Sequence, residues 1–439
     1  MNLKSLKIKG GIPLKGEICI QGSKNAVLPI LAASLLGDGP VVIENCPVIG
    51  DVKDTLRIMK KLGCAVWQEG NVVRVDASAA DGFMIEKEEA ARIRSSVLFL
   101  GALLGKIKKA VLPQPGGCAI GARPIDLHLE SLRQLGAVIE EEEDGWEEKQ
   151  NQSQADPQRK AQSGMLTADG THMHGARIRL RFPSVGATEN SILAAVMLPG
   201  ETIVEHAAQE PEIDQLCEFL NQRGAKIKRE KNAIFIRGGA PLGPVRYRMK
   251  ADRIVTGTYL LAAAASRGTV MIRNFSQELD ALLLLLEKMG GSIEEQDGRL
   301  TFTMPHRARS SAFVETAPYP GFPTDLQSPL MAVLAGAEGV SMIKETLFEN
   351  RFRTAGQLVR MGAQIEIRGS CAKITGCETL VGSVVEAPDL RGGAALAVAA
   401  LQSEGISTIT GMEYVERGYE DIARDLRMLG ADVWEEEQK

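Results

Sequence analysis

Aromatic residues and long apolar segments are scarce in this sequence. Aromatic side chains occupy 4% of the 439 positions, while hydrophobic residues as a whole occupy 44%, so small aliphatic side chains must fill the core. No apolar segment reaches the roughly 18 residues that a membrane-spanning helix requires. Residues 1–17 lack the apolar centre of a signal peptide. We therefore expect neither membrane insertion nor export.

A basic surplus, a metal-binding pattern and a disulfide framework are also missing. Lys and Arg number 51 against 56 Asp and Glu, for a net charge of -5, whereas nucleic-acid-binding proteins usually carry a basic excess. The seven cysteines are odd in number and scattered, without C-x2-C spacing. We expect a cytoplasmic protein that binds no nucleic acid, no metal and no cofactor.

One short phrase recurs six times along the chain. Each copy ends an apolar helical segment with glycine, adds a second small or polar residue, and continues into a β-branched strand residue. Glycine just past a helix can adopt the left-handed conformation that ends it, and the β-branched residue then favours a strand. The six glycines are Gly63, Gly136, Gly224, Gly290, Gly362 and Gly430.

A second pattern, an almost wholly apolar helix followed by a strand, recurs in step with the first. A helix that is apolar on all sides must be buried on all sides, so each copy predicts an interior helix. Six units of about 70 residues predict an α/β protein with two similar halves, divided near Lys250. A solenoid of stacked repeats is the less favoured alternative, because these units carry sheet as well as helix. The six segments are 28–45, 96–113, 190–206, 257–274, 328–345 and 394–411.

The interval between Gly136 and Gly224 is longer than the others. It contains an acidic run at 140–148 and then a polar run to about His174. Like charges without hydrophobic periodicity are typical of solvated segments. We therefore expect an insertion at residues 141–174 that is solvated and partly disordered.

Polar residues precede all six interior helices. Lys24 and Asn25, Arg94, Ser184, Asp252, Asp325 and Asp389 stand at or near these helix starts. The N-terminus of a helix favours an anionic ligand, and six of them in register predict one ligand cleft between the two halves. Guanidinium groups bind phosphates and carboxylates in bidentate fashion, although each cation taken alone could be a solvated surface charge. The cations in question are Lys24, Arg94, Arg123, Arg391 and Arg417.

A glycine-rich loop at 116–128 places Cys118 between glycines, five residues before Arg123. Glycines give such a loop unusual backbone freedom, and a nearby guanidinium favours the thiolate form of a cysteine. On these residues alone, a reactive thiol and an incidental cysteine in a surface turn are equally good interpretations.

These phrases together resemble the enolpyruvyl transferase family, from residue 8 to residue 433 apart from most of the insertion. The motifs that carry the resemblance are GSKNAVLPILAA (22–33), GGCAIGARPIDLH (116–128), PSVGATEN (183–190), FPTDLQ (322–327), ENRF (349–352), DLRGGAAL (389–396) and ERGYED (416–421). The resemblance implies an α/β fold of two inside-out barrel domains, each built from three βαβαββ repeats. It implies one domain at 24–250, with a lid loop around 114–124 and the insertion at 141–174, and a second domain at 1–23 plus 251–439.

The resemblance also implies an activity, the transfer of enolpyruvyl from phosphoenolpyruvate to the 3'-hydroxyl of UDP-N-acetylglucosamine with release of phosphate. This is the first committed step of peptidoglycan synthesis. Cys118 looks like the family's proton donor and fosfomycin target, and Asp325 like its base. Lys24, Arg123, Arg391 and Arg417 look like the clamp for phosphoenolpyruvate, with Lys24 and Arg417 counted as catalytic. The further substrate-binding positions are Asn25, Arg94, Pro124, Ile125, Asp126, Leu127, Ser184, Val185, Gly186, Leu347, Arg351 and Asp389.

Two alternatives and one departure remain. A 5-enolpyruvylshikimate-3-phosphate synthase would share the architecture but lack the cysteine phrase of the loop. A non-catalytic regulatory paralogue would bind the UDP-sugar without turnover, and the intact set of Cys118, Asp325, Lys24 and Arg417 disfavours it. Where many relatives carry a lysine near the UDP phosphates, this chain has Phe182 and Pro183, so no cation is assigned there.

Overall fold

The computed structural model describes residues 4–114, 121, 124–142 and 164–437. Contacts divide the chain into two compact units. The N-unit is formed by residues 23–118 and 122–249, and the C-unit by residues 1–22, 119–121 and 250–439. None of the helices in the described part of the chain is both long enough and apolar enough to span a membrane.

Two sheets in the described part of the N-unit combine one parallel pair of strands with antiparallel neighbours. In the first sheet, β13 pairs in parallel with β3 and the other pairs are antiparallel. The second sheet repeats this arrangement with β9 and β10 as its parallel pair. The third has the antiparallel order β6-β8-β7, and Met84 adds a parallel bridge to β6. The strands are β3 (Val41–Glu44), β4 (Ala65–Glu69), β5 (Val72–Asp76), β6 (Lys109–Pro113), β7 (Val138–Glu142), β8 (Met165–Asp169), β9 (Arg177–Arg179), β10 (Gly200–Glu205), β11 (Lys226–Glu230), β12 (Ala233–Gly238) and β13 (Val245–Arg248).

The C-unit contains three four-stranded sheets with the same combination of pairs. Their strand orders are β15-β16-β14-β2, β17-β18-β20-β19 and β22-β24-β1-β25. Strands β21 and β23 form a separate short two-stranded sheet. Both ends of the chain enter one sheet, because β1 pairs with β24 on one side and β25 on the other. The strands are β1 (Lys4–Lys9), β2 (Lys15–Cys19), β14 (Thr269–Arg273), β15 (Ser292–Gln296), β16 (Arg299–Thr303), β17 (Val314–Glu315), β18 (Val340–Lys344), β19 (Gln364–Arg368), β20 (Cys371–Thr375), β21 (Leu380–Val381), β22 (Val384–Glu386), β23 (Ser403–Glu404), β24 (Ile406–Thr410) and β25 (Asp432–Glu437).

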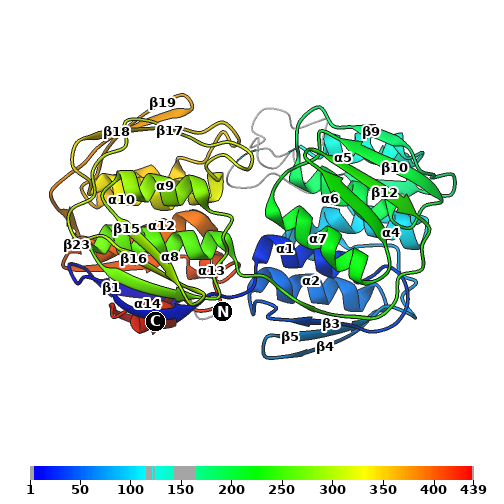
Figure 1. Ribbon diagram of the computed structural model, residues 1–439, viewed down its shortest axis with the longest axis horizontal. Coiled ribbons are helices and arrows are strands. Elements are labelled where there is room, and N and C mark those ends of the chain that lie inside the picture. The colour runs from blue at the N-terminus through cyan, green and yellow to red at the C-terminus, as the bar shows by residue number, and fades with distance from the viewer. Residues whose placement is uncertain (1–3, 115–120, 122–123, 143–163, 438–439) are drawn as a thin grey trace, which may run out of the picture. The chain divides into compact units, whose positions relative to one another are not determined.

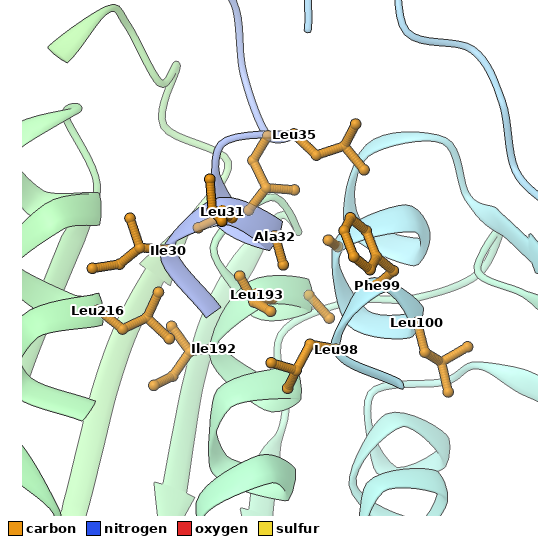
Figure 2. Packing of buried hydrophobic residues seen from close by; sticks show 14 of the residues in the cluster. Ile30, Leu31, Ala32, Leu35, Leu98, Phe99, Leu100, Ile192, Leu193 and Leu216 are labelled. Carbon is orange, nitrogen blue, oxygen red and sulfur yellow. The ribbon is translucent and has the colours of Figure 1, made fainter. Parts of the chain in front are cut away.

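Apolar helices occupy the interior of each unit, as their composition predicts. Nearly every residue in them is buried, and strands surround them in the ribbon view (Figure 1). In the N-unit, Leu31, Phe99 and Leu193 from three such helices point into one apolar cluster (Figure 2). Gly101 allows close packing there, since a Cβ on it would lie 2.5 Å from the Asn190 carbonyl oxygen. The interior helices are α1 (Lys24–Ala33), α4 (Leu98–Lys106), α6 (Val185–Ala195), α8 (Arg253–Ser266), α10 (Gln327–Ala335) and α12 (Leu390–Leu401).

The outer helices end where the repeated glycines predict. All six glycines have a positive φ, from 86° at Gly430 to 111° at Gly224, so the predicted left-handed ends are confirmed. These helices are amphipathic and bury one face. The outer and shorter helices are α2 (Gly50–Lys61), α3 (Lys87–Arg92), η1 (Arg94–Val97), α5 (Asp126–Gln134), α7 (Pro211–Gln222), α9 (Asp280–Lys288), η2 (Thr324–Leu326), α11 (Arg353–Arg360), α13 (Met412–Val415) and α14 (Ile422–Met428).

The expected extent of the insertion, 141–174, is wrong at both ends, because β7 continues to Glu142 and β8 begins at Met165. Strand β8 is the central strand of its sheet and pairs with both β6 and β7. Its alternation places Leu166 and Ala168 in the core, where they are almost fully buried. The strand was missed because these two small apolar residues follow directly on a long polar run. Residues 143–163 of the expected insertion lie outside the described residues.

Candidate functional site

In the N-unit, Lys24 begins α1 and faces an aspartate on the neighbouring helix. Ser23 caps α1 and its hydroxyl accepts from the backbone N–H of Ala26. The Lys24 Nζ lies 3.0 Å from Oδ2 of Asp51 in the first turn of α2, and these side chains are 12% and 5% exposed. The pair combines a fixed cation with a helix N-terminus, which is a favourable setting for an anion. Asn25 is the next residue of the same helix.

Two expected substrate-binding segments of the N-unit, 124–127 and 184–186, are brought together by His128. The His128 Nδ1 lies 2.7 Å from Nδ2 of Asn190 in α6. A Cβ on Gly186 would lie 2.6 Å from Cε1 of His128, so the imidazole packs directly on the backbone at the start of α6. Ser184 caps this helix through Ala187 N–H. The two segments therefore lie side by side, although about 60 residues separate them in sequence.

Asp126 is engaged by a guanidinium that the sequence analysis did not single out. The Arg181 Nη2 lies 2.8 Å from Oδ2 of Asp126 and 2.8 Å from Oε1 of Glu130, and all three side chains are largely exposed. Arg181 immediately precedes Phe182 and Pro183, where no cation had been assigned. Arg181 is therefore the cation nearest in sequence to the two positions, Phe182 and Pro183, where many relatives carry a lysine.

In the C-unit, Asp325 lies between two buried arginines. Its Oδ1 accepts from Nη2 of Arg351 at 2.7 Å, and its Oδ2 accepts from Nη2 of Arg391 at 2.9 Å. The arginine side chains are 3% and 4% exposed, and the aspartate side chain is 26% exposed. Three residues that lie far apart in the sequence thus form one charged cluster that stays accessible at the carboxylate.

Helix capping and a turn hold this cluster in place. The Asp389 carboxylate caps α12 by accepting from the N–H groups of Arg391 and Gly392, both at 2.9 Å. Asp389 therefore positions the start of the helix that carries Arg391. In the adjoining turn, Glu345 accepts from Thr324 Oγ1 at 2.9 Å and from the N–H of Leu347 at 2.9 Å.

Arg391 is charged and partly unsatisfied. Burial opposes its charged form, but Asp325, Tyr419 and Asp252 outweigh this effect and raise the pKa of the guanidinium above its usual value. Its Nη1 is buried and donates no hydrogen bond to the described residues. A buried donor of this kind is stabilised when a ligand supplies an acceptor. An anionic ligand beside Asp325 would do so.

The remaining expected residues are spread over both units. Arg94 is half-buried at the start of η1, and Arg417 is half-buried in the turn after α13. Cys118 and Arg123 lie outside the described residues, so the structure places neither of them. The described residues contain no group of three or more His, Cys, Asp or Glu side chains that could hold a metal ion.

The sequence matches a family model over residues 8–426. The model is described as EPSP synthase (3-phosphoshikimate 1-carboxyvinyltransferase), and 1-carboxyvinyl is another name for enolpyruvyl. The chain belongs to this enolpyruvyl transferase family.

Relatives of this enolpyruvyl transferase match it along almost the whole chain. The UDP-N-acetylglucosamine 1-carboxyvinyltransferase 2 of Caldanaerobacter subterraneus subsp. tengcongensis is 41% identical over 97% of this chain and 98% of the relative. The UDP-N-acetylglucosamine 1-carboxyvinyltransferase of Lawsonia intracellularis is 40% identical over 98% of this chain and 99% of the relative.

Solved structures support the fold. The enolpyruvyl transferase NikO from Streptomyces tendae superposes with a TM-score of 0.85 at 24% identity, and all of both chains is covered. EPSP synthase from Acinetobacter baumannii gives a TM-score of 0.72 at 18% identity, over 99% of this chain and 100% of that one. At these identities the likeness establishes the mixed α/β fold of enolpyruvyl transferases.

Sequence reasoning missed several residues that shape these sites in the enolpyruvyl transferase. Asp51 contacts the expected Lys24, and Arg181 contacts the expected Asp126, each from another segment of the chain. No local pattern marks these two residues, because the contacts join distant parts of the chain. His128 and Asn190 contact each other and lie within motifs of the resemblance, but the sequence analysis gave them no role.

Proposed function

We propose that this enolpyruvyl transferase transfers the enolpyruvyl group of phosphoenolpyruvate to the 3'-hydroxyl of UDP-N-acetylglucosamine and releases phosphate. This reaction is the first committed step of peptidoglycan synthesis. The observation that carries the proposal is the 40–41% identity to relatives named for this activity, over 97–98% of the chain. The family model and one structural neighbour are named for a phosphoshikimate acceptor, but that structural likeness rests on 18% identity.

We also propose the finer architecture, two inside-out barrel domains of three βαβαββ repeats each, at 24–250 and at 1–23 plus 251–439. The interior helices and the shared strand pairing of the sheets support it. The reaction takes place in the cytoplasm in this proposal, in keeping with scattered cysteines that form no disulfide framework.

Addition to an enol phosphate needs a base at the hydroxyl and an acid at the methylene carbon. We assign the base to Asp325 and the acid to Cys118. Asp325 takes the proton of the 3'-hydroxyl while the sugar 3'-oxygen bonds to C2 of phosphoenolpyruvate. The Cys118 thiol gives its proton to C3. The Cys118 thiolate then takes a proton back from C3, the C2–C3 double bond re-forms, and the bond between C2 and the phosphate oxygen breaks. The leaving phosphate takes the proton held by Asp325.

Cations offset the charge of the leaving phosphate. We assign this part to Lys24, Arg123, Arg391 and Arg417. The buried Nη1 of Arg391 supports the assignment, because this donor has no acceptor among the described residues. We assign the binding of the UDP-sugar to Asn25, Arg94, Pro124, Ile125, Asp126, Leu127, Ser184, Val185, Gly186, Leu347 and Arg351, and the support of Arg391 to Asp389.

The test is release of inorganic phosphate from phosphoenolpyruvate by the purified full-length protein. We expect release that depends on UDP-N-acetylglucosamine and is not supported by shikimate 3-phosphate. Release with shikimate 3-phosphate instead would assign the other acceptor. No release with either acceptor would leave the non-catalytic paralogue as the better interpretation.

The two proton-transfer assignments are tested by substitution. Asp325→Ala should abolish turnover while the UDP-sugar still binds, because the base is lost and the cations remain. Cys118→Ser should lose covalent labelling by fosfomycin, followed by mass spectrometry of the intact protein. Undiminished turnover in the alanine variant, or labelling of the serine variant at the wild-type rate, would contradict the respective assignment.

A further inference from the structure

Tyr419 lies against the guanidinium of Arg391. The guanidinium carbon is 5.9 Å from the centroid of the Tyr419 ring, and the two residues are 3% and 1% exposed. A cation within about 6 Å of an aromatic face is attracted to it, and more strongly where water is excluded. The ring therefore helps to hold Arg391 where it is.

Tyr419 is itself fixed by two side chains from other elements. Its hydroxyl lies 2.8 Å from Oγ1 of Thr258 in α8. Gln21 holds the backbone on both sides of the tyrosine, since its Nε2 donates to Gly418 O at 3.0 Å and its Oε1 accepts from Glu420 N–H at 2.9 Å. Neither the ring nor its backbone can shift without breaking a buried hydrogen bond.

This arrangement leaves one side of the Arg391 guanidinium for a ligand. Its Nη2 is bonded to Asp325, whereas its buried Nη1 finds no acceptor within the described part of the chain. The aromatic face can support the cation, but it offers no strong acceptor for that N–H. A fixed guanidinium with an unused donor is suited to bind an anionic substrate group without reorganisation.

We propose that Tyr419 is a positioning residue, which holds Arg391 so that Nη1 is presented to the anionic group of phosphoenolpyruvate. The inference rests on the proposed function and extends it to a residue that was assigned no role in the reaction. Tyr419 acts through Arg391 and is not itself a substrate contact. Gln21 and Thr258 in turn hold Tyr419.

The decisive pair of variants is Tyr419→Met and Tyr419→Phe. Methionine fills a similar volume without an aromatic face, so kcat/KM for phosphoenolpyruvate should fall about 5- to 30-fold while KM for the UDP-sugar stays within about 2-fold. Phenylalanine keeps the aromatic face and loses only the contacts of the hydroxyl with Arg391 and Thr258, so it should restore kcat/KM for phosphoenolpyruvate to within about 3-fold of the wild type. An unchanged kcat/KM in Tyr419→Met would overturn the proposal.

Tyr259→Met is the matched control. Tyr259 is equally buried in α8, and its hydroxyl donates to Oδ2 of Asp425 at 2.7 Å. Its loss should lower stability comparably without a selective effect on phosphoenolpyruvate. If both methionine variants weaken both substrates equally, Tyr419 has a structural role alone. If Tyr419→Met does not fold, Thr258→Val serves in its place, with an expected rise of about 3-fold in KM for phosphoenolpyruvate and none for the UDP-sugar.

Binding of inorganic phosphate separates this proposal from the proposed function. A wild-type protein without turnover would refute the function, yet calorimetric titration with phosphate would still report on Arg391. Tyr419→Met should then bind phosphate about 5- to 30-fold more weakly than Tyr419→Phe. Equal affinities would refute the positioning role, whatever the reaction is.

Discussion

At the scale of single residues, the Asp325 carboxylate partly offsets the charge of the two arginines beside it. Both of its oxygens accept from buried guanidiniums, at 2.7 Å from Arg351 and 2.9 Å from Arg391. An anion bound at Nη1 of Arg391 would therefore share that guanidinium with Asp325. The negative charge of Asp325 should then weaken the binding of such an anion.

Asp325→Asn should therefore bind inorganic phosphate more tightly than the wild type, although it should not turn over. The amide keeps the shape but removes the internal anion, and the buried guanidiniums then gain more from an external one. We expect an increase of roughly 10-fold in affinity, measured by calorimetric titration. The control combines Asp325→Asn with Arg391→Met, and this double variant should lose the gain in phosphate affinity. Weaker phosphate binding in Asp325→Asn would mean that the aspartate holds the arginines in place and that this effect outweighs the effect of its charge.

A buried carboxyl, Glu189 in α6, predicts a pH dependence of stability. Burial raises its pKa well above 4.5, and Glu212 and Glu210 raise it further. The native state thus keeps a proton that the unfolded state loses, so the free energy of unfolding falls as pH rises from about 4.5 towards the native pKa.

Glu189→Gln removes this dependence because glutamine resembles the protonated form. Urea unfolding should find the variant close to the wild type at pH 5 and relatively more stable at pH 8. A stability difference that is the same at both pH values would show that Glu189 is ionised in the native state.

At the scale of elements, substitutions of one glycine within α11 and one just after it can distinguish the effect of helix propensity from that of backbone strain. Gly356 lies exposed within α11, and Gly362 follows the helix with a φ of 94°. A Cβ at either position would meet nothing within 4 Å. Gly356→Ala should raise the free energy of unfolding by about 0.5–1 kcal/mol. Gly362→Ala should lower it by about 1–2 kcal/mol. Urea unfolding measures both, and changes of equal sign would contradict the conformational explanation.

The elements show what the sequence could predict and where it failed. The interior helices were predictable because they are apolar on every side, and the glycine ends because only glycine readily takes a positive φ. Strand β8 was not, since Leu166 and Ala168 offer too little alternation beside a polar run. Part of the candidate site was predictable for the same reason. Lys24, Asp325 and Arg391 lie at the starts of interior helices, which the apolar composition of those helices reveals. Gln21 holds the backbone beside Tyr419 by a hydrogen bond to Gly418, which lies 397 residues further along the chain. No local sequence pattern could predict this contact.

At the scale of the whole molecule, the two units have separate hydrophobic cores. Leu31 of α1 belongs to the N-unit core and Leu396 of α12 to the C-unit core, and both are fully buried. Each substitution to alanine leaves a cavity and should lower the free energy of unfolding by about 2–5 kcal/mol. Because the two core clusters share no residues, we expect the loss of protection to follow the unit that holds the cavity.

Hydrogen exchange followed by mass spectrometry tests this expectation in the full chain. Leu31→Ala should accelerate exchange in peptides from α1, α4 and α6 and leave those from α8, α10 and α12 at the wild-type rate. Leu396→Ala should do the reverse, so each variant is the control for the other. The physical reason is that slow exchange in buried helices reports the opening of the cooperative unit that contains them. If either variant accelerated all six helices equally, the chain would open as one cooperative unit, and the proposed two-domain organisation would not describe its stability.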